Sequence, residues 1–349
     1  MNMKRVLIIA TSHKTRGGIT SVIKAHEQGE QWKKFHCKWI STHRDDNKFI
    51  KIFYFLRAVF IFLLYLPFID LVHIHFSEYS SARRKMFFAK TSKIFGKKVI
   101  LHFHAPDPDN TYLKHPRFYS KLFSLADSII VLSEKWKDSL LSSLPIEANK
   151  VKVIFNPCPR VTLTEKIVQK PYILYAGTLN QRKGYYDLIN AFSAIASKHP
   201  EWKLILAGNG EIHKGKELVF KNNISDQVEF RGWVVDSDKD LLFKEASIFC
   251  LPSYAEGFPM AVLDAWAYGL PVITTPVGGI PDIVVNGANA LLFSPGDVKH
   301  LSSLLDSLME NESSRLKLSK ASLEMSQTTF NIDYINQQIG ELYDSLLNE

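Results

Sequence analysis

The chain has 349 residues, of which 46% are apolar and 22% carry a formal charge. This length exceeds one ordinary hydrophobic core and predicts two domains, and the composition excludes a disordered chain. The three cysteines, Cys37, Cys158 and Cys250, are far apart in the sequence. They form neither a metal-ligand spacing nor an even disulfide set, which favours a reducing cytoplasm.

The net charge of +8 is unevenly distributed along the chain. Residues 1–150 contain 25 Lys and Arg against 12 Asp and Glu, whereas residues 151–349 contain 18 against 23. A basic half is typical of proteins that bind nucleic acid or an anionic membrane, and also of a solvated surface with no partner. The asymmetry indicates that the two halves meet different partners.

The chain begins with basic residues and an apolar run, RVLIIATS (5–12), which superficially suggests a signal peptide. The run is short and has no small-x-small cleavage site, so we interpret it as a first buried strand. A loop, HKTRGG, and a helical pattern, ITSVIKAH, follow it. This order predicts a phosphate- or substrate-binding turn at Gly17 and Gly18, although a Gly–Gly pair alone is a weak signal.

The most apolar stretch is 49–69, FIKIFYFLRAVFIFLLYLPFI, which follows a strand pattern at 36–42. Only twelve uncharged residues separate Arg57 from Asp70, short of the roughly 18 that a spanning helix needs. The pattern predicts a helix packed in the core or, as the alternative, in contact with a membrane surface. The alternative is supported by basic residues that follow, namely Arg83, Arg84, Lys85, Lys90, Lys93, Lys97 and Lys98.

Two further strand patterns, 70–76 and 97–105, contain His-x-His pairs, His73/His75 and His102/His104. Alternate residues on a strand share a face, so these pairs could bind zinc. In a buried parallel strand, however, the last residue of a pair is also the one that reaches the carboxyl edge, where ligands bind. We therefore predict no metal site here and expect His104 to contact a substrate.

Closely spaced aspartates offer a second candidate metal site. Asp107 and Asp109 have a spacing that can hold a divalent ion on a nucleotide phosphate. The same spacing recurs among Asp236, Asp238 and Asp240, which shows how unspecific it is. Solvated turn residues account for these pairs better, so no metal is predicted.

Strand patterns alternate with helical patterns over most of the chain. After 127–133 and 149–157, a polar, proline-punctuated stretch leads to a second series at 171–179, 202–211, 227–233, 246–253 and 270–275. From about Val298 the pattern is helical to the end. This alternation predicts an α/β fold with two parallel sheets. The predicted divisions are a domain at 1–160, a linker at 161–170, a domain at 171–328 and a helix at 329–349.

The segment 256–279, EGFPMAVLDAWAYGLPVITTPVGG, combines a carboxylate, a loop and a short helical pattern. Glu256 precedes the helix, and Asp264 lies eight residues later, so both can face one end of it. A carboxylate beside free helix N–H groups suits a ligand with hydroxyl and phosphate groups. Arg182 and Lys183 precede another helix, and two cations beside a helix N-terminus predict a diphosphate site, with a solvated helix start as the alternative.

These motifs together resemble the retaining glycosyltransferases of family 4, the group 1 glycosyl transferases, which have the GT-B fold. The resemblance covers nearly the whole chain and is strongest in EGFPMAVLDAWAYGLPVITTPVGGIPDIV (256–284) and YAGTLNQRKGYYDLINAF (175–192). Further matching segments are RGGITSVI (16–23), DLVHIH (70–75), VILHFHA (99–105), DSIIVLS (127–133), LILAGNGE (204–211) and VEFRGW (228–233). The resemblance implies two Rossmann-like domains that face across a cleft, with the C-terminal helix returning to the N-terminal domain.

The resemblance also implies roles for individual residues. Lys183, supported by Arg182, would neutralise the leaving diphosphate, Glu256 would hold hydroxyls of the donor sugar, and His104 would contact that sugar near C6. The nucleotide-sugar site would comprise Gly17, Gly18, Gly177, Thr178, Gly208, Arg231, Gly232, Trp233, Val234, Gly257, Phe258, Pro259, Met260 and Asp264. Asp264 would bind the ribose, Gly17 and Gly18 would lie against the phosphates, and Arg231–Val234 would border the base.

This sequence departs from the family pattern at three places. Asp264 stands where the E-x7-E motif has its second glutamate, and is one methylene shorter. Thr178 follows Gly177 where the family has arginine, a charge that Arg182 would replace. The Gly-Val-Asp that usually follows an Asn-Pro pair is missing after Asn156–Pro157.

The function expected from these features is hexosyl transfer from a UDP- or GDP-sugar to a glycan or polyprenyl-diphosphate-linked acceptor. The expected pathway is synthesis of a bacterial surface polysaccharide such as O-antigen lipopolysaccharide, capsule or exopolysaccharide. We expect a cytoplasmic enzyme, in peripheral contact with the inner membrane through its basic half, that needs neither a metal cofactor nor nucleic acid. The alternatives are a GT-B sugar-nucleotide epimerase and a non-catalytic basic protein that binds membrane or nucleic acid. A dinucleotide dehydrogenase is disfavoured because no glycine segment has the G-x-G-x-x-G spacing.

Overall fold

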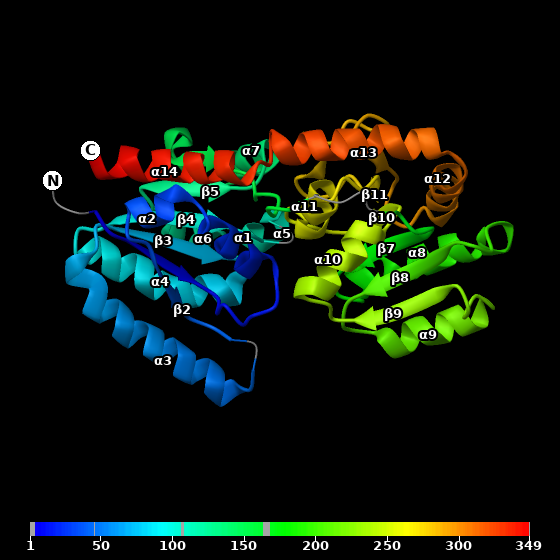
Figure 1. Ribbon diagram of the computed structural model, residues 1–349. Helices are drawn as coiled ribbons and strands as arrows, with labels where there is room; N and C mark the ends of the chain where they lie inside the picture. Colours follow the sequence, from blue (N-terminus) through cyan, green and yellow to red (C-terminus); the bar gives the residue numbers. More distant parts are fainter. Residues whose placement is uncertain (1–3, 45, 106–107, 163–167, 349) are drawn as a thin grey trace. The chain divides into compact units, whose positions relative to one another are not determined.

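The computed structural model describes residues 4–44, 46–105, 108–162 and 168–348. The chain forms two compact units: unit 1 comprises Met1–Pro157 and Ile332–Glu349, and unit 2 comprises Cys158–Asn331 (Figure 1). Each unit contains a six-stranded sheet in which all neighbouring strands are parallel, which confirms the predicted α/β fold with two parallel sheets. The predicted linker, 161–170, includes residues 163–167 that lie outside the described part of the chain.

The sheet of unit 1 has the strand order β2-β1-β3-β4-β5-β6. Its central strands β1 and β3 are buried along their whole length, as expected where helices cover both faces. The strands are β1 (Val6–Ala10), β2 (Lys38–Ser41), β3 (Leu71–Phe76), β4 (Lys98–Phe103), β5 (Ser128–Val131) and β6 (Val151–Val153). The helices are α1 (Gly18–His26), α2 (Glu30–Lys34), α3 (Lys48–Tyr65), α4 (Tyr79–Ile94), α5 (Pro108–Leu113), α6 (Pro116–Phe123), α7 (Glu134–Ser143) and α14 (Ile332–Asn348), with 3-10 turns η1 (Leu66–Phe68) and η2 (Ala148–Lys150).

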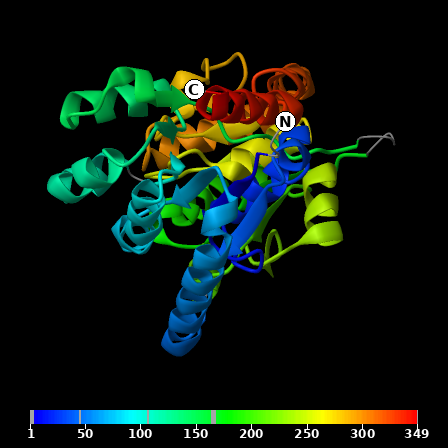
Figure 2. The same cartoon turned by 90° about the vertical axis from the view of Figure 1, so that its left-hand side faces the viewer.

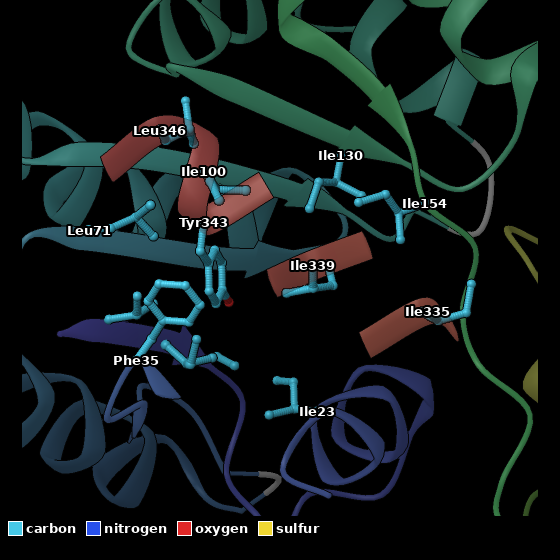
Figure 3. Close-up of a cluster of buried hydrophobic side chains, with 13 residues drawn as sticks. Ile23, Phe35, Leu71, Ile100, Ile130, Ile154, Ile335, Ile339, Tyr343 and Leu346 are labelled. Carbon is cyan, nitrogen blue, oxygen red and sulfur yellow. The ribbon is translucent and has the colours of Figure 1, made fainter. Parts of the chain in front are cut away.

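The last helix, α14, is part of the core of unit 1. Ile335, Ile339, Tyr343 and Leu346 follow a spacing of three or four residues, so they line one face of the helix. Figure 3 shows this face against side chains from the sheet and from the first helices; they include Ile23, Phe35, Leu71, Ile100, Ile130 and Ile154. A buried amide, Asn336, also accepts a hydrogen bond from Gln31 at 2.9 Å. Unit 1 therefore needs both ends of the chain.

The sheet of unit 2 has the strand order β12-β11-β10-β7-β8-β9. Its strands are β7 (Tyr172–Ala176), β8 (Lys203–Ala207), β9 (Val228–Gly232), β10 (Ile248–Leu251), β11 (Val272–Thr274) and β12 (Leu291–Leu292), the last of which was not predicted. The helices are α8 (Tyr185–Ser193), α9 (Ile212–Lys221), α10 (Asp236–Glu245), α11 (Met260–Ala267), α12 (Val298–Glu310) and α13 (Glu312–Gln327), with 3-10 turns η3 (Gln181–Lys183), η4 (Ala196–Lys198) and η5 (Ile280–Asp282). Trp266 on α11 is fully buried and packs against the ring of Phe330, which closes the core beside α13.

Helix α3 differs from the core-packed helix predicted for the apolar stretch 49–69. Ala58 and Phe62 are fully buried, but most of the large apolar side chains of α3 are exposed. Only a narrow face of this helix is therefore packed in the core. The reason is that a helix at the edge of a sheet can bury one stripe only, whatever its other faces contain.

Candidate functional site

The loops that follow β7 and β10 form the candidate site of unit 2. These two strands are neighbours in the sheet. From β7 the chain builds β8 and β9 on one side, and then crosses to β10, β11 and β12 on the other. The boundary between β7 and β10 is thus the point where the strand order reverses, and ligands of open α/β sheets bind outside the carboxyl ends of strands at such a point.

Lys183, after β7, and Glu256, after β10, meet at this point. The Lys183 Nζ lies 2.5 Å from the Glu256 Oε1, and the Ser253 hydroxyl donates to the same carboxylate oxygen at 2.6 Å. The side chain of Glu256 is 7% exposed and that of Lys183 is 15% exposed. A nearly buried charge pair of this kind is costly to desolvate, so its retention at the end of two central strands points to a role in binding.

The local backbone determines why these two side chains meet. Asn180 accepts a hydrogen bond from the backbone N–H of Lys183 at 3.0 Å and so caps the 3-10 turn η3. Gly184 ends that turn at φ 68°, and a Cβ there would lie 1.9 Å from the carbonyl oxygen of Pro252. A Cβ on Gly278, which has φ 61°, would lie about as close to the carbonyl oxygens of Glu256 and Gly257. Only glycine allows these loops to pass so near each other.

Arg182 provides a second cation at the site. Its guanidinium donates to the carbonyl of Ala255 at 2.6 Å and lies 3.7 Å from the Glu256 Oε2. The side chain is 41% exposed, so it can turn toward a ligand at lower cost than Lys183 can. The structure thus brings Lys183, Arg182 and Glu256 together at one point, and their roles toward a ligand stay predictions.

Asp264, the predicted ribose contact, forms an ion pair within unit 2. It lies on α11, whereas Glu256 precedes that helix, and its Oδ2 accepts from the Lys239 Nζ at 2.7 Å. Lys239 comes from α10 and is 36% exposed. The shorter carboxylate therefore already has a cationic partner, which a ribose hydroxyl would have to share or displace.

The remaining candidates in unit 2 lie in loops at the same edge of the sheet. Gly177 and Gly208 follow the neighbouring strands β7 and β8, and a Cβ on Gly208 would lie 1.8 Å from the Gly177 carbonyl oxygen. Helix α11 begins at Met260 after Pro259 without a side-chain cap, so its first N–H groups can face a ligand. Thr178 is exposed. The segment Arg231–Val234 ends β9, where the Arg231 Nε lies 2.8 Å from the Glu229 Oε1 and Trp233 is 39% exposed.

The candidates in unit 1 also follow central strands. Helix α1 begins at Gly18, and Gly17 has φ 147°, a conformation that favours glycine. His104 follows β4 and its backbone N–H donates to the Phe76 carbonyl at 2.8 Å. The roles of all of these residues toward a ligand stay predictions.

His104 belongs to a cluster of histidines inside unit 1, which comprises His26, His73, His75, His102 and His104. The His73 Nε2 lies 3.2 Å from the His102 Nδ1, and the His75 Nδ1 lies 3.0 Å from the His104 Nε2. The register that pairs His75 with His102 across β3 and β4 sets these contacts. Desolvation by burial is the main cause that lowers the pKa of every member, to about 4 for His26 and about 3 for His104.

Acidification should therefore destabilise unit 1. A histidine with a lowered folded-state pKa stays neutral while the unfolded chain binds a proton, so stability falls as pH drops below about 6.5. The loss continues until the folded-state pKa, at about 4 for His26. Each histidine contributes about 1.4 kcal/mol per pH unit in this window. Calorimetry from pH 7 to pH 5, where most carboxylates stay ionised, should show a transition temperature that falls with pH. The variant His75→Asn should reduce this dependence of the transition temperature on pH. The control His213→Asn, at an exposed histidine, should not reduce it. A transition temperature that does not change with pH would contradict this prediction.

Two groups of described residues have the spacing of metal ligands. One is His73, His75 and His102; the other is His199, Asp306 and Glu310. In the first group the His73 Nδ1 lies 2.7 Å from the Tyr343 hydroxyl oxygen, and its other nitrogen faces His102. Lys198 lies 2.9 Å from Asp306 and 2.5 Å from Glu310 in the second. Members of the first group therefore have hydrogen-bond partners and members of the second have ion pairs with Lys198. The absence of a metal stays a prediction. Asp107 and the side chain of Asp109 lie outside the described residues.

Three residues of the site were missed in the sequence. Ser253 falls within the strand pattern 246–253, but β10 ends at Leu251 and leaves Ser253 in the loop, three residues before its partner Glu256. Its position after a strand could have identified it. Lys239 carried no signal, because only the fold brings α10 against α11. Asn180 could have been recognised as a cap residue before a helix.

Comparison with protein families gives two consecutive matches. Residues 164–325 match the model described as "Glycosyl transferases group 1", and residues 8–159 match "Glycosyltransferase Family 4". The chain is similar to an uncharacterized glycosyltransferase of Haemophilus influenzae, with 30% identity over 63% of this chain and 61% of that protein. It is also similar to the amylovoran biosynthesis glycosyltransferase AmsK of Erwinia amylovora (24% identity, 79% of this chain, 70% of that protein). The capsular polysaccharide biosynthesis glycosyltransferase CapM of Staphylococcus aureus is 24% identical over 64% of this chain and 63% of its own length.

Solved structures show the same fold. Sucrose-phosphate synthase of Thermosynechococcus elongatus superposes with a TM-score of 0.81 at 18% identity, covering 99% of this chain and 100% of that one. Anabaena HepE in complex with UDP superposes with a TM-score of 0.78 at 18% identity, covering 98% and 100%. HepE has also been solved with UDP-glucose.

Proposed function

Because the chain belongs to the group 1 glycosyl transferases of family 4, we propose that it moves a sugar from a nucleotide-sugar to a glycan or lipid-linked saccharide with retention of anomeric configuration. The observation that carries the proposal is the group formed by Lys183, Arg182 and Glu256 at the end of β7 and β10. It offers two cations for a diphosphate and a carboxylate for sugar hydroxyls. Unit 2 therefore binds the donor in this proposal, and unit 1 binds the acceptor.

The charges of the group match the charges that develop in the reaction. Breaking the bond between the anomeric carbon and phosphate leaves negative charge on the diphosphate and positive charge on the sugar. Lys183 and Arg182 stabilise the first, together with the uncapped N–H groups at the start of α11. Glu256 orients the sugar hydroxyls and favours the positively charged sugar. The acceptor attacks from the face that the diphosphate leaves, so no enzyme nucleophile is required.

Donor, acceptor and location follow from the same proposal. HepE binds UDP and UDP-glucose, which supports a UDP-sugar donor, with a GDP-sugar as the other choice. AmsK and CapM take part in amylovoran and capsular polysaccharide biosynthesis, which supports a surface-polysaccharide precursor, such as a polyprenyl-diphosphate-linked saccharide, as the acceptor. Such an acceptor places the enzyme in the cytoplasm, in peripheral contact with the inner membrane through unit 1.

The enzyme requires no divalent metal in this proposal, because side-chain cations occupy the place that a metal would take on the diphosphate. Of the three aspartates on α10, Asp240 already bonds to Lys244 and to the Tyr268 hydroxyl. Donor binding should therefore persist when divalent ions are removed.

A thermal-shift panel of UDP-, GDP-, ADP- and dTDP-sugars tests the donor site. We expect one of them to raise the melting temperature, because ligand at 100 times Kd adds about 2.7 kcal/mol to stability. The shift, and transfer to an added acceptor, should be unchanged in EDTA. The product after incubation without acceptor separates the two enzyme classes, because an epimerase converts the free donor and a transferase hydrolyses it slowly. No shift with any sugar nucleotide would refute the donor site, and loss of the shift in EDTA would refute the metal-free mechanism.

A further inference from the structure

Helix α3 carries a second apolar face that nothing in the described part of unit 1 covers. Seven large apolar residues point outward on it; their exposed fractions are 84% for Phe49, 48% for Ile52, 63% for Phe53, 61% for Leu56, 65% for Phe60, 45% for Leu63 and 55% for Leu64. At 100° per residue, these positions fall within about 120° of the helix circumference. No charged residue lies in this arc. We call these seven residues the outer face of α3.

The opposite face of α3 holds the helix against unit 1. Ala58 and Phe62 of α3 and Leu66 of η1 are buried, and the rings of Phe55 and Phe62 pack edge-on against Phe88 of α4. Lys38 of β2 donates a hydrogen bond to the Tyr65 hydroxyl. Figures 1 and 2 both show α3 running along the edge of unit 1 and away from its sheet. The helix is therefore anchored on one side and uncovered on the other.

The strand connections of unit 1 determine whether α3 can cross a membrane or can only lie on its surface. Phe49–Phe68 is the one stretch of the described residues that is long and apolar enough to cross a bilayer by length and composition. However, β2 precedes α3 and β3 follows it, and both pair with β1 in one sheet. A helix that spanned the bilayer would put these two strands on opposite sides of the membrane. Helix α3 can therefore lie only in the surface plane of a bilayer.

Helix α4, which packs beside α3, supplies positive charge next to the outer face. Its exposed residues Arg83, Phe87, Lys90 and Ile94 are spaced three or four apart, so they share one face, and Phe87 contacts Phe62 of α3. Neither α3 nor α4 contains an Asp or Glu. The ion pairs of this region join Arg44 to Asp46 and Lys93 of α4 to Asp127, and among the described residues none includes Arg57 or Lys90. Ile94 and Phe95, at the end of α4, are 80% and 57% exposed.

We infer that the outer face of α3 docks unit 1 on the surface of an anionic lipid bilayer, with the basic face of α4 on the lipid phosphates. Large apolar side chains beside lysine and arginine, without acidic residues, match the acyl–headgroup boundary of such a membrane. An acidic protein partner would not need an apolar arc of seven bulky residues. The inference rests on the proposed function in one respect, since it places the enzyme where a lipid-linked acceptor lies.

Vesicle sedimentation tests the docking surface directly. The full-length protein should sediment with vesicles of phosphatidylglycerol and phosphatidylethanolamine, and more weakly with phosphatidylcholine alone. The triple variant F53S/L56Q/F60S should bind about 100-fold more weakly, because three bulky apolar contacts with the acyl chains are lost. The matched control F220S/L316Q replaces side chains of unit 2 that are 77% and 61% exposed and should bind like the wild type.

The charged residues give a second, independent readout. R57Q and K90Q should each weaken binding to anionic vesicles by about fivefold and leave binding to phosphatidylcholine unchanged. Raising NaCl from about 50 to about 500 mM should reduce the difference between the two lipid compositions. Equal vesicle binding by the triple variant and the wild type, or no vesicle binding by the wild type, would overturn the inference.

Two further measurements distinguish membrane docking from self-association and from a misassigned donor site. Light scattering could instead show a dimeric wild type and a monomeric triple variant, with no vesicle binding. That result would mean that the outer face binds a second copy of the chain. The sugar-nucleotide thermal shift should be the same in the triple variant and the wild type, because the donor group lies in unit 2. Vesicle binding that is lost in the triple variant while its thermal shift is intact therefore bears on docking alone. A thermal shift that is absent in both the wild type and the triple variant bears on the proposed function alone.

Discussion

Lys183→Ala should lower kcat for sugar transfer by about 100- to 1,000-fold, the cost of removing one preorganised group from a developing negative charge. The side chain of Lys183 is 15% exposed and its Nζ lies 2.5 Å from Glu256, so it is already positioned before the donor arrives. The interaction strengthens as the diphosphate leaves, so kcat should fall more than donor affinity. Arg182→Ala should have a smaller effect, because the Arg182 side chain is 41% exposed and its interaction is screened by water.

The control for Lys183 comes from the same two strands. Lys170 precedes β7 and pairs at 2.7 Å with Glu245, which precedes β10, so this pair lies at the amino edge of the sheet. Lys170→Ala should leave kcat unchanged. Steady-state rates with melting temperatures distinguish a catalytic loss from unfolding. A Lys183→Ala enzyme with wild-type kcat would remove this residue from the mechanism.

Glu256→Ala should abolish nearly all transfer, with a rate loss of about 1,000-fold or more, because it removes the sugar contact and leaves Lys183 without its partner. Glu256→Gln separates the two effects. The amide keeps the volume and can still accept from the Ser253 hydroxyl, whereas the negative charge is lost. We expect Glu256→Gln to retain donor binding in the thermal-shift assay and to lose most of kcat.

Asp264→Glu provides the contrast within the same motif. The longer side chain restores the length that the family has, so this variant should be as active as the wild type or more active. Glu245→Ala, at the opposite edge of the sheet, is the matched control for the loss of a paired carboxylate. Full activity in Glu256→Ala would eliminate the assignment of the donor-sugar contact, and strong inactivation by Asp264→Glu would show that the bond between Asp264 and Lys239 is required.

The fold was predictable because buried parallel strands leave a simple pattern. Largely apolar runs such as VLIIA and LVHIHF mark strands covered on both faces, and the helical patterns between them require parallel pairing. Strand ends were less predictable: the pattern at 202–211 predicts one strand, but β8 ends at Ala207. Gly208 and Gly210 let the chain turn there, close to the Gly177 and Leu179 carbonyls.

The sequence by itself determined the family and the two parallel sheets, because its motifs and buried strand patterns are local. The roles of Lys183, Arg182 and Glu256 toward a ligand stay predictions. Only the tertiary structure decided which partners those charges have. Lys239 reaches Asp264, and Ser253 reaches Glu256, through the packing of elements that no local pattern relates. The tertiary structure also decided that α3 buries one apolar face and exposes the other, because burial depends on neighbouring elements and apolarity alone does not specify them.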